Sequence, residues 1–306
     1  MRRNAYLAMW KSITNGAEVK RRKNGYTMKN IHFFLALPLF ILTSLEIMAD
    51  ETDLHQLWDQ QLEQYVAYSP DEGPSAVVNY KKWGQNTGPL QRYLETLENI
   101  SVKQYKRWPE AKQLAFLINA YNAYTVNLVL SHYSQIDSIK DIGSLWSSPW
   151  DIEVGNLLGK SRTLDDIEHG MIRGTIDGLK REGFNGFDEP RIHFAVNCAS
   201  RSCPPLRQEA YTGHSLDRQL EAQTKQFLGN TRENRYTDGQ LEVSKIFDWY
   251  RDDFTAGWKG ASSLNDFFLL YADTLNMDAE AESALKNNAV AVTFNDYNWA
   301  LNDKVD

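Results

Sequence analysis

The strongest constraint on this chain is one long apolar helix in the middle of the sequence. Residues 109–133 read PEAKQLAFLINAYNAYTVNLVLSHY, and Pro109 and Glu110 are typical of a helix start. From Leu114 to Leu130, apolar side chains occupy nearly every face of this helix and not a single stripe. Because a helix that is apolar on all sides must be buried, we predict that it forms the centre of the fold.

Shorter patterns on either side predict helices and short strands without the regular alternation of a βαβ fold. Most of the predicted strands are joined by tight turns, so we expect mostly antiparallel pairing. The sequence therefore predicts an α+β fold in which the buried central helix packs with short, mostly antiparallel strands. The predicted helices cover residues 54–66, 90–97, 164–173, 215–228, 247–254 and 263–275, and the predicted strands lie within 148–164 around a Gly155-Asn156 turn, at 191–197, on both sides of Asp238-Gly239 and at 291–295.

The short helix at 164–173 has signals at both of its ends. Thr163 and Asp166 have the spacing of a capping box, and Gly174 can end the helix because glycine tolerates the left-handed conformation. The later segment 191–197, RIHFAVN, alternates partly in polarity and is followed by CASRSCPPL. We predict a strand that leads into a rigid loop closed by two prolines.

The N-terminal region has the order of a secretory signal peptide. Residues 28–49 combine a basic start at Lys29, an apolar stretch and a small residue, Ala49, before an acidic segment, so cleavage is expected after Ala49. The apolar stretch is shorter than the roughly 20 residues that span a bilayer, which disfavours a permanent membrane anchor. Residues 1–27 are interpreted as an upstream extension from a start codon assigned too early.

Charge and composition exclude some classes of partner for the remaining chain, residues 50–306. Residues 1–49 hold eight Lys or Arg and two Asp or Glu, so the net charge of −7 for the whole chain becomes −13 without them. Such a chain is repelled by phosphate groups, which argues against nucleic acid and against anionic membrane surfaces as partners. The segment contains no linker-like stretch or repeat. We therefore predict one globular domain, periplasmic or secreted after cleavage and without stable membrane insertion.

The two cysteines, Cys198 and Cys203, lie in the same predicted loop and have two interpretations. In an oxidising compartment they would form a local disulfide. Alternatively Cys198 is a catalytic thiol, because Ala199, Ser200 and Ser202 follow it in a loop whose backbone N–H groups could hold an oxyanion. The residues alone leave both interpretations open.

A catalytic thiol needs a base, and two histidines are candidates. His169 is favoured because Asp165 and Asp166 lie four and three residues before it on the same side of the predicted helix, where either carboxylate could orient the imidazole. Glu168 is adjacent in sequence but points about 100° away around an ordinary α-helix. His193, on the predicted strand before Cys198, is the alternative base.

Two amides on the central helix, Asn119 and Asn122, must find hydrogen-bond partners if they are buried. They either tie loops to the helix or position a substrate carbonyl. The acidic pair Asp252 and Asp253 is most simply a solvated helix face. No paired ligand spacing, HExxH motif or glycine-rich phosphate loop occurs, so we expect no metal and no cofactor.

Five motifs in order resemble one known family. The chain is similar, from about residue 75 to 306, to the domain of unknown function 547 family, which is found in exported bacterial proteins and in plant proteins. The motifs that carry the resemblance are FLINAYNAYTVNLVL, LDDIEHGMIR, RIHFAVNCASRSCPPL, IFDWYRDDF and FNDYNWALND.

The resemblance implies a ranking of the candidate residues. The family motifs place an acidic residue beside a histidine, matching Glu168 and His169, and a cysteine matching Cys198. Cys203 with Pro204 resembles bacterial members but is dispensable in plant-like ones. This favours a fold resembling thiol hydrolases and a Cys-His-Glu constellation that acts on a small-molecule or peptide-like amide. A non-catalytic ligand-binding or scaffold domain is the alternative. The remaining candidate positions are Asp166 for orienting the histidine and Asn119, Asn122, His193, Ser200 and Cys203 for binding substrate.

Overall fold

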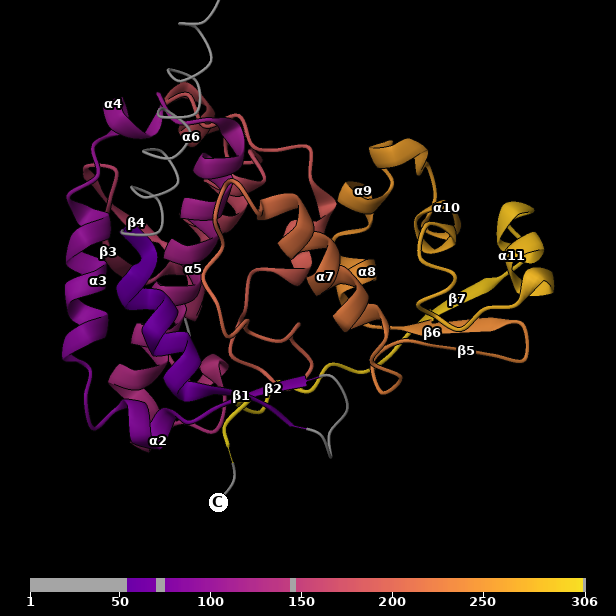
Figure 1. The fold of residues 1–306 in the computed structure, drawn as a ribbon, viewed down its shortest axis with the longest axis horizontal. Coiled ribbons are helices and arrows are strands. Elements are labelled where there is room, and N and C mark those ends of the chain that lie inside the picture. The colour runs from indigo at the N-terminus through magenta and orange to yellow at the C-terminus, as the bar shows by residue number, and fades with distance from the viewer. Residues whose placement is uncertain (1–53, 70–74, 144–146, 305–306) are drawn as a thin grey trace, which may run out of the picture. The chain divides into compact units, whose positions relative to one another are not determined.

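The central helix of the computed structural model is α5 (Glu110–His132), and it begins directly after Pro109 (Figure 1). Every residue from Leu114 to Val126 is buried, which confirms the predicted central position of this helix. By length and composition, Glu110–Gln135 is the one helix among the described residues that could cross a membrane. However, 83% of the most apolar 18-residue segment of this helix is buried inside the protein, as expected for the core helix of a folded domain.

The structure describes residues 54–69, 75–143 and 147–304, which all belong to one unit, Glu46–Asp306. The predicted signal peptide at 28–49 and the extension at 1–27 lie outside the described residues.

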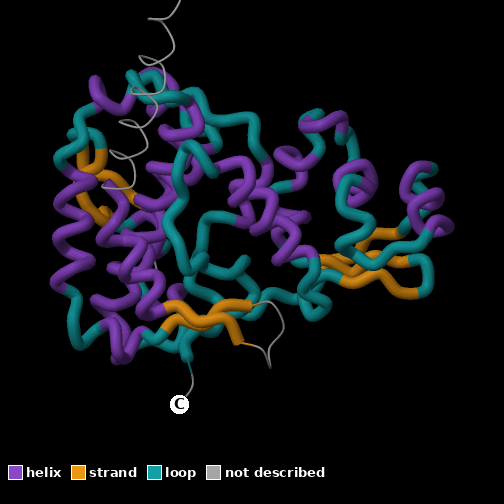
Figure 2. Tube along the Cα trace, viewed as in Figure 1, coloured by secondary structure: helices purple, strands orange, loops and turns teal. Residues whose placement is uncertain are grey.

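Helices dominate the described residues (Figure 2). Residues 54–65 are helical and confirm the first predicted helix, and α3 and α7 confirm the predictions at 90–97 and 215–228. The helices α2, α4, α6 and α11 were not predicted. The other helices besides α5 are α2 (Tyr80–Trp83), α3 (Gly88–Glu98), α4 (Val102–Tyr105), α6 (Asp177–Arg181), α7 (Leu216–Leu228), α8 (Ile246–Trp249), α9 (Arg251–Phe254), α10 (Leu264–Leu269) and α11 (Ala279–Lys286).

Seven described strands form three small sheets. Two sheets are antiparallel pairs, β1 with β2 and β3 with β4, and in the third β6 pairs antiparallel with β5 but parallel with β7. The α+β class and the mostly antiparallel pairing are thus confirmed, including the hairpin at Asp238-Gly239. The strands are β1 (Val66–Ser69), β2 (Ser75–Val78), β3 (Glu153–Leu157), β4 (Lys160–Thr163), β5 (Arg235–Thr237), β6 (Gln240–Val243) and β7 (Ala291–Phe294).

The predicted turn between β3 and β4 was misplaced. The chain reverses at Leu158 and Gly159, which have φ of 55° and 83°, and not at Gly155-Asn156. Gly155 lies inside β3, where a Cβ atom would come within 2.5 Å of the ring of Tyr124. That glycine therefore makes room for an aromatic ring of α5 and does not form the turn.

The segment 191–197 is not a strand, contrary to the prediction. Residues Pro190–Phe194 form a 3₁₀-helix, and the side chain of Glu189 accepts a hydrogen bond from the backbone N–H of Arg191. Pro190 favours a helix start because its ring sets a helical φ and its missing N–H needs no partner. The partial alternation was misleading because this segment is buried on all sides and not on one face.

Two hydrophobic clusters meet along this 3₁₀-helix. Ile192 and Ala195 belong to the cluster around α5, whereas Phe194 belongs to a second cluster built from the C-terminal helices and the sheet of β5, β6 and β7. The loop that carries Cys198 follows directly, so it starts at the junction of the two clusters.

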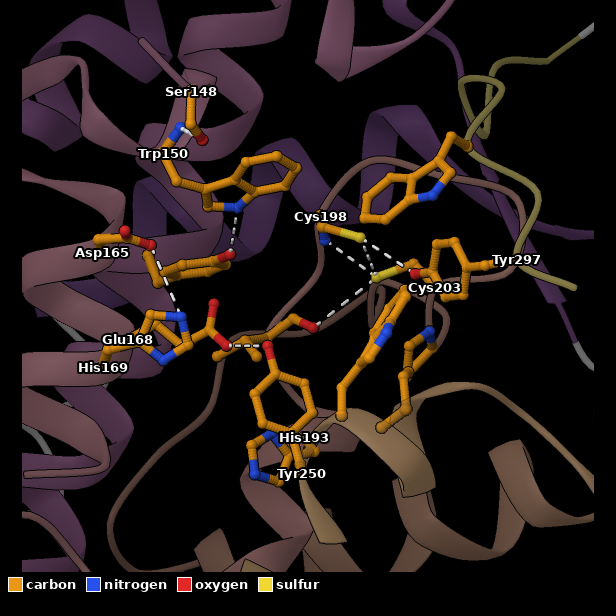
Figure 3. Close-up of a pocket in the computed structure, with 16 residues that line it drawn as sticks. Ser148, Trp150, Asp165, Glu168, His169, His193, Cys198, Cys203, Tyr250 and Tyr297 are labelled. Carbon is orange, nitrogen blue, oxygen red and sulfur yellow. Dashed lines mark hydrogen bonds and ion pairs between the residues drawn. The ribbon is translucent and has the colours of Figure 1, made fainter. Parts of the chain in front are cut away.

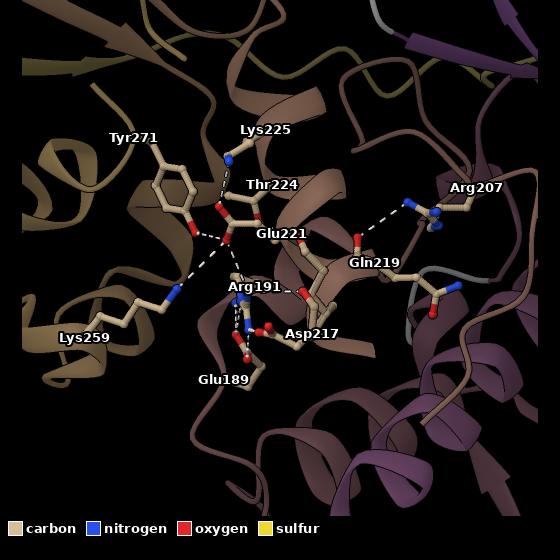
Figure 4. A network of polar contacts seen from close by, with 11 residues as sticks. Glu189, Arg191, Arg207, Asp217, Gln219, Glu221, Thr224, Lys225, Lys259 and Tyr271 are labelled. Carbon is tan, nitrogen blue, oxygen red and sulfur yellow. Dashed lines mark hydrogen bonds and ion pairs between the residues drawn. The ribbon is translucent and has the colours of Figure 1, made fainter. Parts of the chain in front are cut away.

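A buried arginine joins the 3₁₀-helix to α7 (Figure 4). Arg191 is 4% exposed and forms ion pairs with the carboxylates of Glu189, Asp217 and Glu221 at 2.7, 2.7 and 3.3 Å. Its guanidinium also lies over the ring of Trp258, 4.9 Å from the centroid. Because the carboxylates come from two elements, this network holds the segment before Cys198 against its neighbour.

The short helix before the candidate site begins and ends as predicted, but its winding differs. Thr163 and Asp166 form the predicted capping box, with backbone to side-chain distances of 3.2 and 3.0 Å. Gly174 follows the last turn with φ of 63°. Between these ends, Asp166–Ile172 winds as a π-helix, a wider turn that is frequent at functional sites.

Candidate functional site

A cavity of about 270 Å³ brings several candidate residues together (Figure 3). Its walls come from α5, the π-helix, the 3₁₀-helix, the cysteine loop, α8 and the C-terminal segment after β7. The predicted residues that line it are Glu168, His169, His193, Cys198 and Cys203.

The loop geometry turns Cys198 toward this pocket. Asn197 stabilises the loop, because its side chain donates to the carbonyl of Pro204 at 2.8 Å and accepts from the N–H of Ala199 at 2.9 Å. Ala199 has φ of 59°, a left-handed conformation that is unusual for a residue with a Cβ. Such strain persists only where the surroundings enforce it, and it clusters at functional sites.

Three groups hydrogen-bond to the Cys198 thiol. Its Sγ lies 3.0 Å from Cys203 Sγ, 3.2 Å from the Tyr297 hydroxyl and 3.3 Å from the Ser200 hydroxyl, and both cysteines are free thiols. The hydrogen bond from Cys203, followed by those from Ser200 and Tyr297, lowers the pKa of Cys198 despite its desolvation. Burial, followed by the hydrogen bond with Cys198, raises the pKa of Cys203, so Cys203 remains a thiol that can donate a hydrogen bond to a Cys198 thiolate.

His169 lines the same pocket but does not contact Cys198. Its Nδ1 lies 2.8 Å from Nη1 of Arg173, and its Nε2 lies 3.6 Å from a carboxylate oxygen of Asp165. Because a guanidinium only donates, Nδ1 must accept this hydrogen bond, which leaves the proton of the neutral ring on Nε2. The imidazole therefore points Nε2–H toward Asp165, four residues before it, as the sequence predicted.

Glu168 is buried and faces the pocket, where it does not orient His169. Its Oε1 accepts a hydrogen bond from the Tyr250 hydroxyl at 2.8 Å. Burial, followed by the charge of Glu168, raises the pKa values of Tyr250 and Tyr121. Both phenols therefore remain protonated and can donate to this carboxylate.

His193 is a buried residue of the pocket wall. Its Nε2 lies 2.7 Å from Asp253, and its ring stacks on Tyr250 with centroids 3.8 Å apart. Burial lowers the pKa of His193. Burial also favours the protonated form of Asp253, but hydrogen bonds from His193 and Arg173 outweigh this effect and leave the pKa of Asp253 below its ordinary value. Asp253 therefore binds both His193 and Arg173 and is not the solvated acid that the sequence indicated.

Four predicted site residues do not line the pocket. Asn119 exchanges two hydrogen bonds with the backbone of Tyr211, and Asn122 bonds to the backbone of the 195–197 segment. Both amides therefore tie loops to α5, one of the two roles considered from the sequence. Asp166 caps the π-helix, and Ser200 contacts Cys198 without forming part of the wall.

Sequence reasoning missed the aromatic walls and the bridging cation. Arg173 donates to His169 and twice to Asp253, at 2.6 and 3.1 Å, and thereby links the π-helix to α9. Two motifs in the sequence, IFDWYRDDF and FNDYNWALND, could have indicated this wall. Both combine several aromatic residues with polar ones, without the apolar pattern of a core segment. The aromatic lining residues are Tyr121, Trp150, Trp249, Tyr250, Tyr297 and Trp299. No group of three or more His, Cys, Asp or Glu in the described ranges is arranged to hold a metal ion.

The fold and the pocket define an α+β protein with a free thiol in an aromatic, acidic cavity. Residues 105–228 match the family described as "Protein of unknown function, DUF547", which supports the resemblance carried by the sequence motifs. No curated protein matches the chain, and no solved structure matches it. The matched segment includes Glu168, His169 and Cys198 but ends before α8 and the C-terminal segment, which supply Trp249, Tyr250, Tyr297 and Trp299.

Proposed function

We propose that this domain is an exported, periplasmic thiol-dependent hydrolase or acyl transferase that acts on a peptide-like or amide substrate. One observation carries the proposal: Cys198 has a lowered thiol pKa and lines a pocket that His169 also lines. A nucleophilic cysteine needs both features, a stabilised thiolate and access to a bound carbonyl group.

In the proposed reaction, Sγ of Cys198 forms a bond to the acyl carbon and the bond from that carbon to the leaving amine breaks. The amine takes the proton that the thiol gave up, with His169 as the carrier and Asp165 orienting the ring. Water or a second amine then attacks the thioester and releases the thiol. Because the Nδ1 lone pair of His169 accepts from Arg173, proton uptake there requires this contact to open.

The first test is acylation by a small activated ester. Incubation with p-nitrophenyl acetate is expected to add one acetyl group to Cys198, seen as an intact-mass increase and as rapid release of p-nitrophenol. The Cys198→Ser variant should lose both signals, because an alcohol at this position is not ionised near neutral pH. Acetylation of the parent elsewhere than on Cys198, or none at all, would count against the proposal.

A matched control separates the two thiols. Cys203→Ser keeps a hydroxyl donor near Cys198, so acylation of Cys198 should persist there. Its rate should fall at neutral pH, because the largest contribution to the lowered thiol pKa comes from Cys203.

One observation favours a second candidate, a non-catalytic ligand-binding or scaffold domain with a Cys198–Cys203 disulfide. The two sulfur atoms are only 3.0 Å apart, so a mild oxidant could join them with little movement. For the proposed enzyme, we expect the protein purified without reductant to have the intact mass of the dithiol. A mass lower by two hydrogen atoms in material that also resists acylation would favour the scaffold.

A further inference from the structure

The pocket wall is aromatic and acidic. Six of its sixteen lining residues are aromatic, and two, Asp165 and Glu168, are carboxylic acids. Among the described residues that line it, none is Lys or Arg. An aromatic ring presents a negative face to a bound group, so both kinds of side chain favour a cation in this space.

Nearby basic groups do not cancel this preference. Among the described lining residues, the bases are two histidines: burial lowers the pKa of His193, and the lone pair of His169 is engaged by Arg173. Arg173 is not among the lining residues, and it donates to both carboxylate oxygens of Asp253. The described lining residues therefore place no Lys or Arg side chain in the wall beside these carboxyl groups.

Glu168 is the least compensated of these charges. It is 4% exposed, and its carboxylate accepts a hydrogen bond from the Tyr250 hydroxyl at 2.8 Å. It makes no ion pair with any residue in the described part of the chain, although buried carboxylates are rarely found without a paired charge. A carboxylate that is buried, directed into a cavity and lacking a cation marks a place where a ligand could supply one.

The aromatic rings are positioned by one another. The Trp150 indole N–H donates to the Tyr121 hydroxyl at 3.3 Å, and Trp249 and Trp299 stack with centroids 5.7 Å apart. Figure 3 shows Trp150 and Tyr250 on either side of the Glu168 carboxylate. Trp249 is 45% exposed and forms part of the rim.

We infer that this pocket binds an alkylammonium group, held between the aromatic walls and the carboxylate of Glu168. This inference rests on the proposed function in one respect, namely that the ammonium group belongs to the substrate. The amide or ester that reaches Cys198 then carries a positively charged amine. Anionic substrates are disfavoured by the same carboxylates. The binding step itself does not require the thiol.

The test is a titration with tetramethylammonium, followed by tryptophan fluorescence because three tryptophans line the pocket. We expect a saturable change with the cation and none with tert-butanol, a neutral group of similar shape. Glu168→Gln should weaken binding at least about tenfold, while Glu280→Gln on the exposed face of α11 should leave it unchanged. No saturable change, or equal binding by Glu168→Gln, would overturn the inference.

Two further variants keep the test decisive. Trp249→Ala alters only a half-exposed rim residue, so it should fold and still bind the cation several-fold more weakly. Cys198→Ser should bind it as the parent does. A parent protein that binds tetramethylammonium but is not acylated on Cys198 would refute the thiol mechanism alone, whereas a parent that is acylated but does not bind the cation would refute this inference alone.

Discussion

Replacing Arg191 with methionine is expected to lower the free energy of unfolding by about 3–5 kcal/mol, the usual cost of breaking a buried charge network from one side. Three carboxylates, from Glu189, Asp217 and Glu221, face this guanidinium, and removing it leaves them close together without their shared cation (Figure 4). Urea denaturation at neutral pH measures the loss.

The control for this prediction is an exposed arginine in an ion pair. Arg235 on β5 pairs with Glu242 and is about half exposed, so Arg235→Met should cost at most about 1 kcal/mol. Equal effects of the two substitutions would mean that the Arg191 network does not stabilise the fold beyond an ordinary surface pair.

Lowering the pH from 7 to 4.5 is expected to remove about 3 kcal/mol of stability through one buried histidine, His55. Burial, followed by the charge of Lys112, lowers the pKa of His55 from 6.5 to about 3. Below pH 6.5 the unfolded chain binds a proton at this ring and the folded chain does not, so stability falls with pH until the folded protein also binds it, near pH 3. Other groups add their own pH dependence.

The His55→Phe variant isolates this contribution. Phenylalanine keeps an aromatic ring beside Tyr93 and Phe116 but cannot titrate. Its stability at pH 7 will be lower, because the Tyr93 hydroxyl loses a partner at 2.7 Å. The informative quantity is the change between pH 7 and pH 4.5, which should be smaller than in the parent by about 3 kcal/mol. An identical change in both proteins would contradict the prediction.

Predictions from the local sequence were correct where a segment had one clear pattern, such as a uniformly apolar run or an Asp-Gly turn. The run from Leu114 to Val126 is so uniformly apolar that only a buried helix accommodates it, and Asp238-Gly239 marks a hairpin in any context. The 190–194 segment failed because it is buried on all sides, and burial on all sides erases the periodicity that distinguishes a strand from a helix.

The candidate site was predicted only in part. Cys198, Glu168 and His169 were named from the sequence and line one pocket. Asp165, one of the two acids predicted to orient His169, lies beside it, whereas Glu168 hydrogen-bonds to Tyr250, a partner that was not predicted.

The sequence by itself determined the elements whose cause is local: the buried central helix, the capped short helix ending at Gly174, and the loop that carries both cysteines. Only the tertiary structure decided which of these elements meet. Cys198 contacts Tyr297, 99 positions later, and Arg173 contacts Asp253, 80 positions later. The reason is physical: hydrophobic periodicity and capping act over a few residues, whereas a hydrogen-bond partner is selected by how distant segments pack.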